Sequence, residues 1–252
     1  MSTEPTVVKS ADRVLAVFDL LAERGPLSFS DICEALELPK SSTHNLLHTM
    51  VIRGYLDRDP QQKAFRLGVR VWQVAQHCTD VEHLRRLLRP LMERLVERTE
   101  ETVQLATLDG VSAVYLEIVE SPHPMKLTSK VGSRLPAHAS AVGKVLLAHL
   151  PAGEAGARLA GADLVRMTDR TLTTVDALLR DLALTRQRGY GLDMEEFVIG
   201  CRCVAMPVRN ADGTVIAALS VSIPTPRYSR ETAAAARAEL AATVAEAERL
   251  IG

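Results

Sequence analysis

Apolar residues in the first quarter of the chain recur at the three-to-four-residue spacing of helices that bury one face. Residues 11–23 predict a first helix, which Gly25 and Pro26 end. A second helix begins near Ser28, whose hydroxyl can cap it, and a third covers residues 40–53. The inward face of the third helix consists of Thr43, Leu46, Leu47, Met50 and Val51.

Two short strand patterns follow at residues 55–57 and 64–67, and the polar, turn-rich segment 58–63 joins them as a small wing. Two helices with a short turn between them, followed by a wing, are typical of a winged helix-turn-helix, whose last helix enters the major groove of DNA. We therefore expect residues 8–70 to form a winged helix-turn-helix DNA-binding domain.

The next segment, residues 69–99, predicts helix with interruptions near Asp80 and Pro90. Its first part, residues 71–82, is expected to be a connector helix. It would couple the DNA-binding domain to whatever binds in the rest of the chain.

Strand patterns begin beyond residue 101. They occur in two hairpins, which pair residues 103–108 with 111–119 and residues 201–208 with 215–223. Helices are expected at residues 140–149, 152–160, 174–189 and 230–250. The sequence thus predicts an α+β chain of two domains, in which residues 83–252 form an α/β domain with a mostly antiparallel sheet.

The composition agrees with such a chain. Of the 252 residues, 47% are apolar and 24% are charged, which is ordinary for a globular protein with a full core. The segment Met1–Pro5 lacks the features of a secretory signal, and apolar runs such as Val215–Leu219 are too short to cross a bilayer. We expect a cytoplasmic protein without a membrane partner.

Charge is distributed unevenly, although the net charge of the whole chain is only −1. Residues 1–38 carry three basic and seven acidic side chains, whereas residues 39–70 carry six basic and two acidic ones. The third helix and the wing therefore form a local basic patch of the kind that DNA phosphates attract.

The polar face of the third helix is the candidate base-reading surface. Asn45 can form paired hydrogen bonds with adenine, worth about 1–3 kcal/mol against a wrong base. Lys63 and Arg66 of the wing are expected to hold the DNA backbone. The alternative is a face that is merely solvated or contacts protein, and the wing and basic patch disfavour it. The candidate DNA-binding residues are Ser28, Lys40, Ser41, Ser42, Thr43, His44, Asn45, His48, Arg53, Lys63 and Arg66.

Several motifs, in one order along nearly the whole chain, resemble the IclR family of bacterial transcription regulators. They are Ser10-Ala-Asp-Arg-Val-Leu-Ala-Val-Phe, Leu38-Pro-Lys-Ser-Ser-Thr-His-Asn-Leu-Leu, Phe65-Arg-Leu-Gly, Leu135-Pro-Ala-His-Ala-Ser-Ala-Val-Gly-Lys, Asp193-Met-Glu-Glu and Gly200-Cys-Arg-Cys-Val-Ala-Met-Pro-Val. The resemblance implies a GAF-like effector domain, a homodimer or homotetramer on palindromic operator DNA, and control by a small organic or aromatic acid. It also implies regulation of a catabolic operon, more often as a repressor than as an activator.

The chain departs from the family pattern at two places. Many members have arginine where Asn45 stands, which favours guanine over adenine and changes the expected operator. Small residues, often Gly-Ala, precede the Gly-Lys pair in the family, whereas Ala141 and Val142 stand here. The bulkier pair is expected to narrow the effector pocket.

In the family, the polar contacts to the effector come from positions that match Asp193, Cys203, Ser220 and Ser222. If the last hairpin closes symmetrically around residues 211 and 212, Cys203 pairs with Ser220 and Cys201 with Ser222, on one face of the sheet. The helix start at Ala141 and Val142 offers free N–H groups to a small carboxylate. Asp193 would repel that carboxylate, so it is either protonated or accepts a hydrogen bond from the ligand.

The sequence leaves three other functions as alternatives. The four cysteines, Cys33, Cys78, Cys201 and Cys203, form no Cys-x-x-Cys pair, so reduced thiols are expected. A metal-responsive regulator would use Cys201, Cys203 and His138, with Asp193 as a further ligand. An enzyme would pair Cys203 or Ser140 with His138, but no catalytic motif surrounds them, and a protein-interaction module is the third alternative. We expect no enzyme activity, no cofactor and no resident metal.

Overall fold

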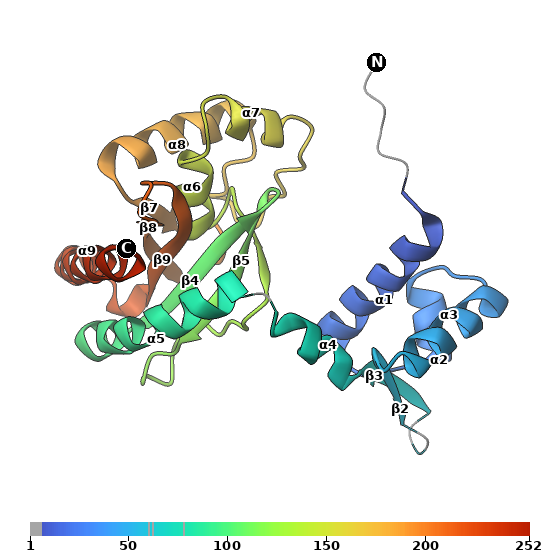
Figure 1. Cartoon of the computed structure of the whole chain (residues 1–252). Coiled ribbons are helices and arrows are strands. Elements are labelled where there is room, and N and C mark those ends of the chain that lie inside the picture. Colours follow the sequence, from blue (N-terminus) through green and yellow to red (C-terminus); the bar gives the residue numbers. More distant parts are fainter. Residues whose placement is uncertain (1–6, 60, 62, 78) are drawn as a thin grey trace. The chain divides into compact units, whose positions relative to one another are not determined.

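The computed structural model describes residues 7–59, 61, 63–77 and 79–252. The chain divides into two compact units, Met1–Thr79 and Asp80–Gly252 (Figure 1). The division falls inside the expected connector, whose own boundaries stay a prediction. Pro60 and Gln62 of the wing, Cys78 and the segment Met1–Pro5 lie outside the described residues.

The smaller unit is a winged helix-turn-helix. Its three strands form one sheet in the order β1-β3-β2, with both neighbouring pairs antiparallel. The elements are α1 (Lys9–Arg24), β1 (Leu27–Ser28), α2 (Phe29–Ala35), α3 (Lys40–Ile52), β2 (Leu56–Asp59), β3 (Ala64–Leu67) and α4 (Val69–Ala75). The three helices and the wing confirm the predicted fold of this domain, and β1 is a strand that the sequence pattern did not indicate.

The core of this unit unites all the elements that carry the predicted apolar faces. Its buried members are Val17, Leu20, Leu21, Ile32, Leu47, Met50, Leu56 and Phe65. Gly68 explains why the Phe-Arg-Leu-Gly motif ends in glycine. A Cβ there would lie 2.4 Å from the carbonyl oxygen of Gly54, so only glycine allows the chain to leave the wing at this point.

The larger unit contains one six-stranded sheet in the order β6-β5-β4-β9-β8-β7, and every neighbouring pair is antiparallel. Its strands are β4 (Thr102–Asp109), β5 (Ser112–Val119), β6 (Arg134–Pro136), β7 (Gly191–Met194), β8 (Cys201–Arg209) and β9 (Val215–Pro224). Its helices are α5 (Thr79–Thr99), α6 (Ala141–Ala148), α7 (Glu154–Leu159), α8 (Val175–Arg188), the 3₁₀ turn η1 (Thr225–Arg227) and α9 (Arg230–Ile251). This arrangement confirms the predicted α+β class.

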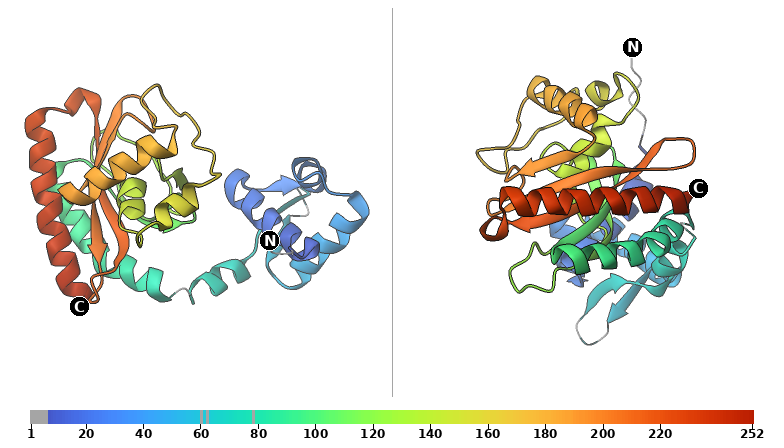
Figure 2. Two further views of the ribbon diagram at one scale, coloured as in Figure 1. Left: turned by 90° about the horizontal axis from the view of Figure 1, so that it is seen from above. Right: turned by 90° about the vertical axis from the view of Figure 1, so that its left-hand side faces the viewer.

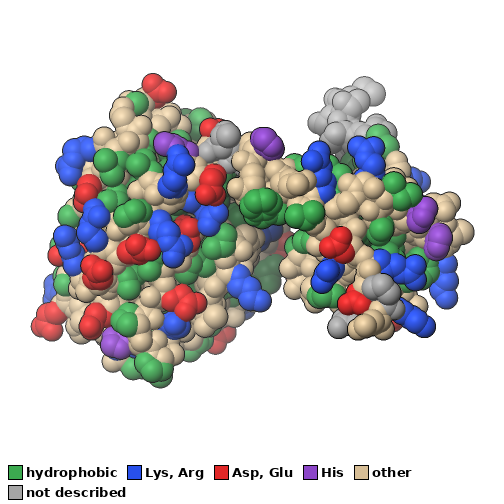
Figure 3. Space-filling model, turned by 60° about the horizontal axis from the view of Figure 1, so that its bottom comes forward, with side chains coloured by type: hydrophobic (Ala, Val, Ile, Leu, Met, Phe, Trp, Pro, Cys, Tyr) green, Lys and Arg blue, Asp and Glu red, His purple; other side chains and the backbone are tan. Residues whose placement is uncertain are grey.

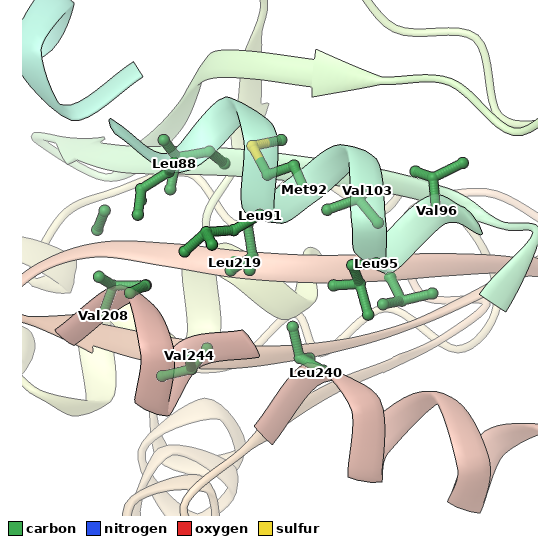
Figure 4. Close-up of a cluster of buried hydrophobic side chains, with 14 of the residues drawn as sticks. Leu88, Leu91, Met92, Leu95, Val96, Val103, Val208, Leu219, Leu240 and Val244 are labelled. Carbon is green, nitrogen blue, oxygen red and sulfur yellow. The ribbon is translucent and has the colours of Figure 1, made fainter. Parts of the chain in front are cut away.

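Helices cover both faces of this sheet (Figures 1 and 2). On one face α5 and α9 direct their leucines and valines toward β4 and β9. Figure 4 shows Leu91 and Leu95 of α5 and Leu240 of α9 near Leu219 of β9. On the other face α6 packs over a floor of small residues that includes Ala106, Ala205 and Ala218. Because these floor residues are small, α6 lies close to the sheet.

The expected interruption of α5 at Pro90 is wrong, because the helix runs through it. Proline removes one backbone hydrogen bond, but the flanking Leu88, Leu91, Met92 and Leu95 are all buried against the sheet. Burying four large side chains outweighs the loss of one bond. The break that does occur lies between α4 and α5, close to Asp80.

Candidate functional sites

The exposed strip of α3 is the first candidate site. Leu47 and Met50 point into the core of the unit, and the opposite face of α3 is polar. Lysine, arginine and histidine side chains gather on the surface of this unit in Figure 3. The predicted residues of α3 and its C-cap that are exposed are Lys40, Ser41, Ser42, His44, Asn45, His48 and Arg53.

Thr43 does not belong to this strip, which corrects its inclusion among the DNA-binding residues. Its side chain is 1% exposed, and its Oγ1 donates to the carbonyl oxygen of Pro39 at 2.9 Å. The hydroxyl thus satisfies its own polarity while its methyl group packs inward. Thr43 stabilises the start of α3 and is not offered to a groove.

Two histidines form the middle of the strip. The rings of His44 and His48 stack with a centroid distance of 6.2 Å and an angle of 11°, one helical turn apart. Phe29 meets His44 edge-on at 6.3 Å. These contacts fix the two rings beside Asn45, whose side chain is exposed. The strip is therefore an ordered polar surface.

Ser28 begins α2 and has a structural role of its own. Its Oγ accepts from the backbone N–H of Asp31 at 3.2 Å, and its N–H donates to the Asp31 carboxylate at 3.1 Å. This reciprocal capping box stabilises the start of α2. The half-buried hydroxyl of Ser28 keeps its own proton available for a further hydrogen bond.

The wing carries the two predicted backbone anchors. Lys63 is exposed and has a φ of +52°, so it turns the chain into β3. Arg66 lies opposite Asp57 across the β2–β3 pair, with Nε and Oδ2 3.6 Å apart and both side chains exposed. Such an exposed pair contributes little to stability, so Arg66 can exchange Asp57 for a phosphate at small cost.

The second candidate site is a cavity between α6 and the sheet of the larger unit. All six residues predicted to bind the effector line it. The complete lining is Tyr115, Leu127, Leu135, Ser140, Ala141, Val142, Asp193, Phe197, Val198, Cys203, Ser220 and Ser222. The cavity has room for about one water molecule, so its walls are nearly closed.

The predicted pairing of the β8–β9 hairpin is wrong by two residues, although Cys203, Ser220 and Ser222 still line one cavity; Cys201 does not line it. Cys203 pairs with Ser222 and Ser220 with Ala205. The loop between Arg209 and Val215 has an odd length, which would turn the serines away from the cysteine. A β-bulge next to Val208 and Arg209 adds one residue to β9 and restores the shared face.

Asp193 lies at the centre of this face, directly opposite Cys203 across the β7–β8 pair. Its Oδ1 accepts from the backbone N–H of Glu196 at 2.7 Å and from that of Phe197 at 3.4 Å. Burial raises the pKa of Asp193 to about 7. The carboxyl group is thus held where it can exist in either protonation state near neutral pH.

Gln104 of β4 is a functional candidate that the sequence analysis missed. Its Oε1 accepts from Ser220 Oγ at 3.0 Å and from Ser222 Oγ at 3.1 Å, and Ser222 Oγ lies 3.1 Å from Cys203 Sγ. Gln104 Nε2 is buried and has no hydrogen-bond partner among the described residues. Strand pairing with Ser220 would have revealed Gln104, but that pairing is not visible in the local pattern.

The start of α6 forms the wall opposite the strands. Ser140 caps the helix by accepting from the N–H of Gly143 at 3.2 Å, and the first-turn N–H groups of Ala141 and Val142 have no partner within the helix. Gly143 is required here, because a Cβ would lie 2.3 Å from Ala137 Cα. The glycine of the Gly-Lys motif therefore lets this helix start pack against the segment that follows β6.

Lys144 follows and is 2% exposed. Its Nζ donates to Glu196 Oε1 at 2.7 Å and lies 3.0 Å from Asp181 Oδ2. Glu196 belongs to the segment between β7 and β8, next to Phe197, which lines the cavity. Lys144 thus ties that segment to α6 and α8.

The surroundings of His138 and Cys203 bear on the metal and enzyme alternatives. His138 Nε2 lies 3.0 Å from the carbonyl oxygen of Val165, and in the part of the chain that the structure describes no cluster of three or more His, Cys, Asp or Glu side chains could hold a metal ion. Cys201 and Cys203 are free thiols, as is Cys33. Contact with the Cys201 thiol and burial raise the pKa of Cys203, which opposes a role as a nucleophile.

A chain that combines a winged helix-turn-helix unit with a second unit containing a nearly closed polar cavity is typical of ligand-controlled DNA-binding regulators. The chain belongs to the IclR family of transcription regulators. The model of the IclR helix-turn-helix domain matches residues 10–60, and that of the bacterial transcriptional regulator IclR C-terminal domain matches residues 76–249. Among the described residues, none of the helices is long and apolar enough to span a membrane.

Individual relatives agree with this assignment. The chain is 39% identical to the HTH-type transcriptional regulator XynR of Escherichia coli K12 over 222 residues, which is 88% of either chain. It is 33% identical to the HTH-type transcriptional repressor AllR of Salmonella typhi, covering 90% of this chain and 85% of AllR. An IclR homolog from Microbacterium hydrocarbonoxydans, solved with 4-hydroxybenzoate, superposes with a TM-score of 0.83 at 31% identity, covering 96% of this chain and 98% of that one.

Proposed function

We propose that this regulator is a repressor of a catabolic operon, controlled by a small organic or aromatic acid that binds the cavity beneath α6, and that it catalyses no reaction. The observation that carries this proposal is the convergence of Asp193, Cys203, Ser220 and Ser222 on one closed cavity. A repressor among the relatives supports repression, and a similar structure solved with 4-hydroxybenzoate supports an organic acid as the ligand. The regulator would act in the cytoplasm, where its operator DNA lies.

The acid would lie between α6 and the strands. Its carboxylate would accept from the N–H groups of Ala141 and Val142, where the helix dipole favours negative charge. A hydroxyl on the ligand would donate to Asp193. Gln104 Nε2, which has no hydrogen-bond partner among the described residues, could donate further hydrogen bonds to the ligand next to Ser220 and Ser222.

Binding would require the cavity to open, because it holds about one water molecule. Leu127 and the Phe197–Val198 pair lie on segments outside the regular strands and helices, so they are the walls that can move. A displacement of Phe197 pulls on Glu196 and, through it, on Lys144. The ligand would thereby change the shape of the larger unit.

We further propose that the DNA-binding form is a homodimer or homotetramer on palindromic DNA. Helix α4 has no buried residue, and Val69 and Trp72, which stand three positions apart on one face, are 66% and 63% exposed. Such an apolar helix face suits contact with a second copy of the chain. Two copies would place two α3 helices in successive major grooves.

Calorimetric titration of the full chain with 4-hydroxybenzoate, benzoate and pyruvate tests the proposed ligand class. Asp193→Ala is expected to weaken binding of the hydroxylated acid, whereas the exposed loop variant Asp212→Asn serves as the matched control. Operator affinity is then measured by mobility shift with and without the acid that binds. Unchanged ligand affinity in Asp193→Ala removes the proposed site, and an operator affinity independent of ligand removes the proposed control.

A further inference from the structure

A second groove lies on the opposite side of the sheet from the candidate effector cavity, between the first turns of α9 and the strands β7 and β8. Its volume is about 280 Å³. It is lined by Tyr190, Leu192, Arg202, Cys203, Val204, Ile223, Tyr228, Arg230, Ala233, Ala234 and Arg237. Only Cys203 is shared with the other cavity.

The charge of this groove is one-sided. Three arginines line it, and its described lining contains no aspartate or glutamate. Arg202 is already paired with Glu195 at 3.2 Å, but Arg230 and Arg237 have no carboxylate within salt-bridge distance among the described residues. Both are exposed, so they place two positive charges at this groove without a direct ion-pair partner in the described chain.

Helix geometry explains why these two arginines act together. Arg230, Ala233, Ala234 and Arg237 stand three, four and seven positions apart, which places them on one face of α9. The two alanines between the arginines are small, so they leave space above the strands. The arginines thus stand at either end of an open trough, and not beside a filled surface.

Two of the three arginines, Arg237 and Arg202, are each held by a tyrosine. The Arg237 guanidinium lies 4.9 Å from the centre of the Tyr190 ring, and its Nη1 donates to the Tyr190 hydroxyl at 3.0 Å. Arg202 lies 4.7 Å from the centre of the Tyr228 ring. The contacts of Arg237 restrict a side chain that is otherwise costly to order, so an anion would meet the Arg237 guanidinium already positioned.

The floor of the groove is apolar, formed by Leu192, Val204 and Ile223. An inorganic ion would leave this floor in contact with water. An anion that carries a flat or aliphatic body covers the floor while its charged group meets Arg230 and Arg237. The size of the groove limits that body to roughly a single ring.

We propose that this groove is a second ligand site, which binds an organic anion with a carboxylate or phosphate group and a small apolar body. Arg230 and Arg237 bind the charged group, and the strand residues contact the body. The inference does not depend on the identity or the existence of an effector beneath α6, because the two sites lie on different faces of the sheet.

Calorimetric titration of the full chain with phenyl phosphate, benzoate and inorganic phosphate tests this site. We expect saturable binding of phenyl phosphate or benzoate, tighter than that of inorganic phosphate, and the better of the two identifies the anionic group. Arg237→Ala should weaken this binding by about tenfold or more, because it removes charge-assisted hydrogen bonds. Arg249→Ala removes the same charge from the last turn of α9 and should leave the affinity unchanged.

Four outcomes overturn the proposal. One is the lack of saturable binding by all three probes, and another is equal binding of inorganic phosphate and phenyl phosphate, which would leave the apolar floor without a role. A third is an equal loss in Arg237→Ala and Arg249→Ala, which indicates general attraction of anions. The fourth is a change of oligomeric state in Arg237→Ala on sedimentation, with ligand affinity unaltered, which marks the groove as a contact between copies.

Discussion

The α3 strip and the cavity beneath α6 are both polar sites, but they satisfy their polar groups in opposite ways. On α3, the side chains of Asn45 and Lys40 are exposed to water, so both can contact DNA directly. At the cavity, Ser220 and Ser222 both donate to Gln104 Oε1, and all three residues are shielded from solvent. A surface site can therefore bind without rearrangement, whereas the buried site must break internal bonds to admit a ligand.

This difference predicts that single substitutions near the cavity cost far more stability than substitutions on the strip. Lys144→Ala leaves the buried Glu196 without its cation and the half-buried Asp181 with only Arg188, 4.0 Å away, which is expected to lower the free energy of unfolding by about 3–5 kcal/mol. Denaturant titration followed by circular dichroism measures the effect. The exposed Arg249→Ala should change stability by less than about 0.5 kcal/mol, and a similarly small change in Lys144→Ala would contradict the role of the buried network.

On the strip, Asn45→Arg should alter which DNA sequence is preferred while leaving the fold intact. Arginine favours guanine and asparagine favours adenine, so discrimination at one base pair should shift by about 1–3 kcal/mol. Selection of bound sequences from a random DNA pool, compared between the two proteins, measures this shift. A uniform loss of affinity for all sequences would instead make Asn45 a positioning residue.

The protonation of Asp193 provides a test that has no counterpart on the strip. Because burial raises the pKa of Asp193 to about 7, the group is neutral below that pH and charged above it. A carboxylate ligand should therefore lose affinity as the pH rises, by about tenfold between about pH 6 and pH 8. In Asp193→Asn the side chain stays neutral, and titration calorimetry should show a flatter profile. A profile equally steep in the variant would assign the effect to another group.

The smallest effect is expected at the wing. Lys63→Ala removes one exposed positive charge, so operator affinity should fall by a similar factor for all sequences. The slope of log affinity against log salt concentration should decrease by about one. Glu37→Ala, an exposed change outside the wing, is the control, and an unaltered salt slope in Lys63→Ala would show that the wing does not contact phosphates.

The sequence predicts which face of α3 is exposed but misses some of the groups around the cavity, for a physical reason. The polar face of α3 follows from local periodicity once Leu47 and Met50 are placed inside, and only Thr43 was misplaced, because its methyl and hydroxyl groups allow both environments. Gln104 escaped notice because its role depends on pairing with Ser220, more than one hundred residues away. The short strands β1, β6 and β7 were missed for the same reason, since two to four residues form a strand only through distant partners.

Family motifs supplied what local patterns could not, and the structure explains two of them. Asp193 and the Gly-Lys pair were placed by resemblance, and they meet because Glu196 bonds both to Asp193 and to Lys144. Tyr115 lines the same cavity but lies outside the family motifs. Burial raises its pKa, so its hydroxyl remains a hydrogen-bond donor at any physiological pH.

The β8–β9 hairpin has a consequence for how this protein can change in length. Its loop has an odd number of residues, five, and the bulge adds one extra residue, Ile216, to β9. Each of these features alone would reverse the faces of β9, and together they keep Cys203 opposite Ser222. Deletion of one loop residue alone would turn β9 over, so that Leu219 and Val221 would replace Ser220 and Ser222 at the cavity. A second deletion at the bulge would restore the original faces. Insertions and deletions in this hairpin should therefore survive in the lineage in pairs, as compensated changes of chain length.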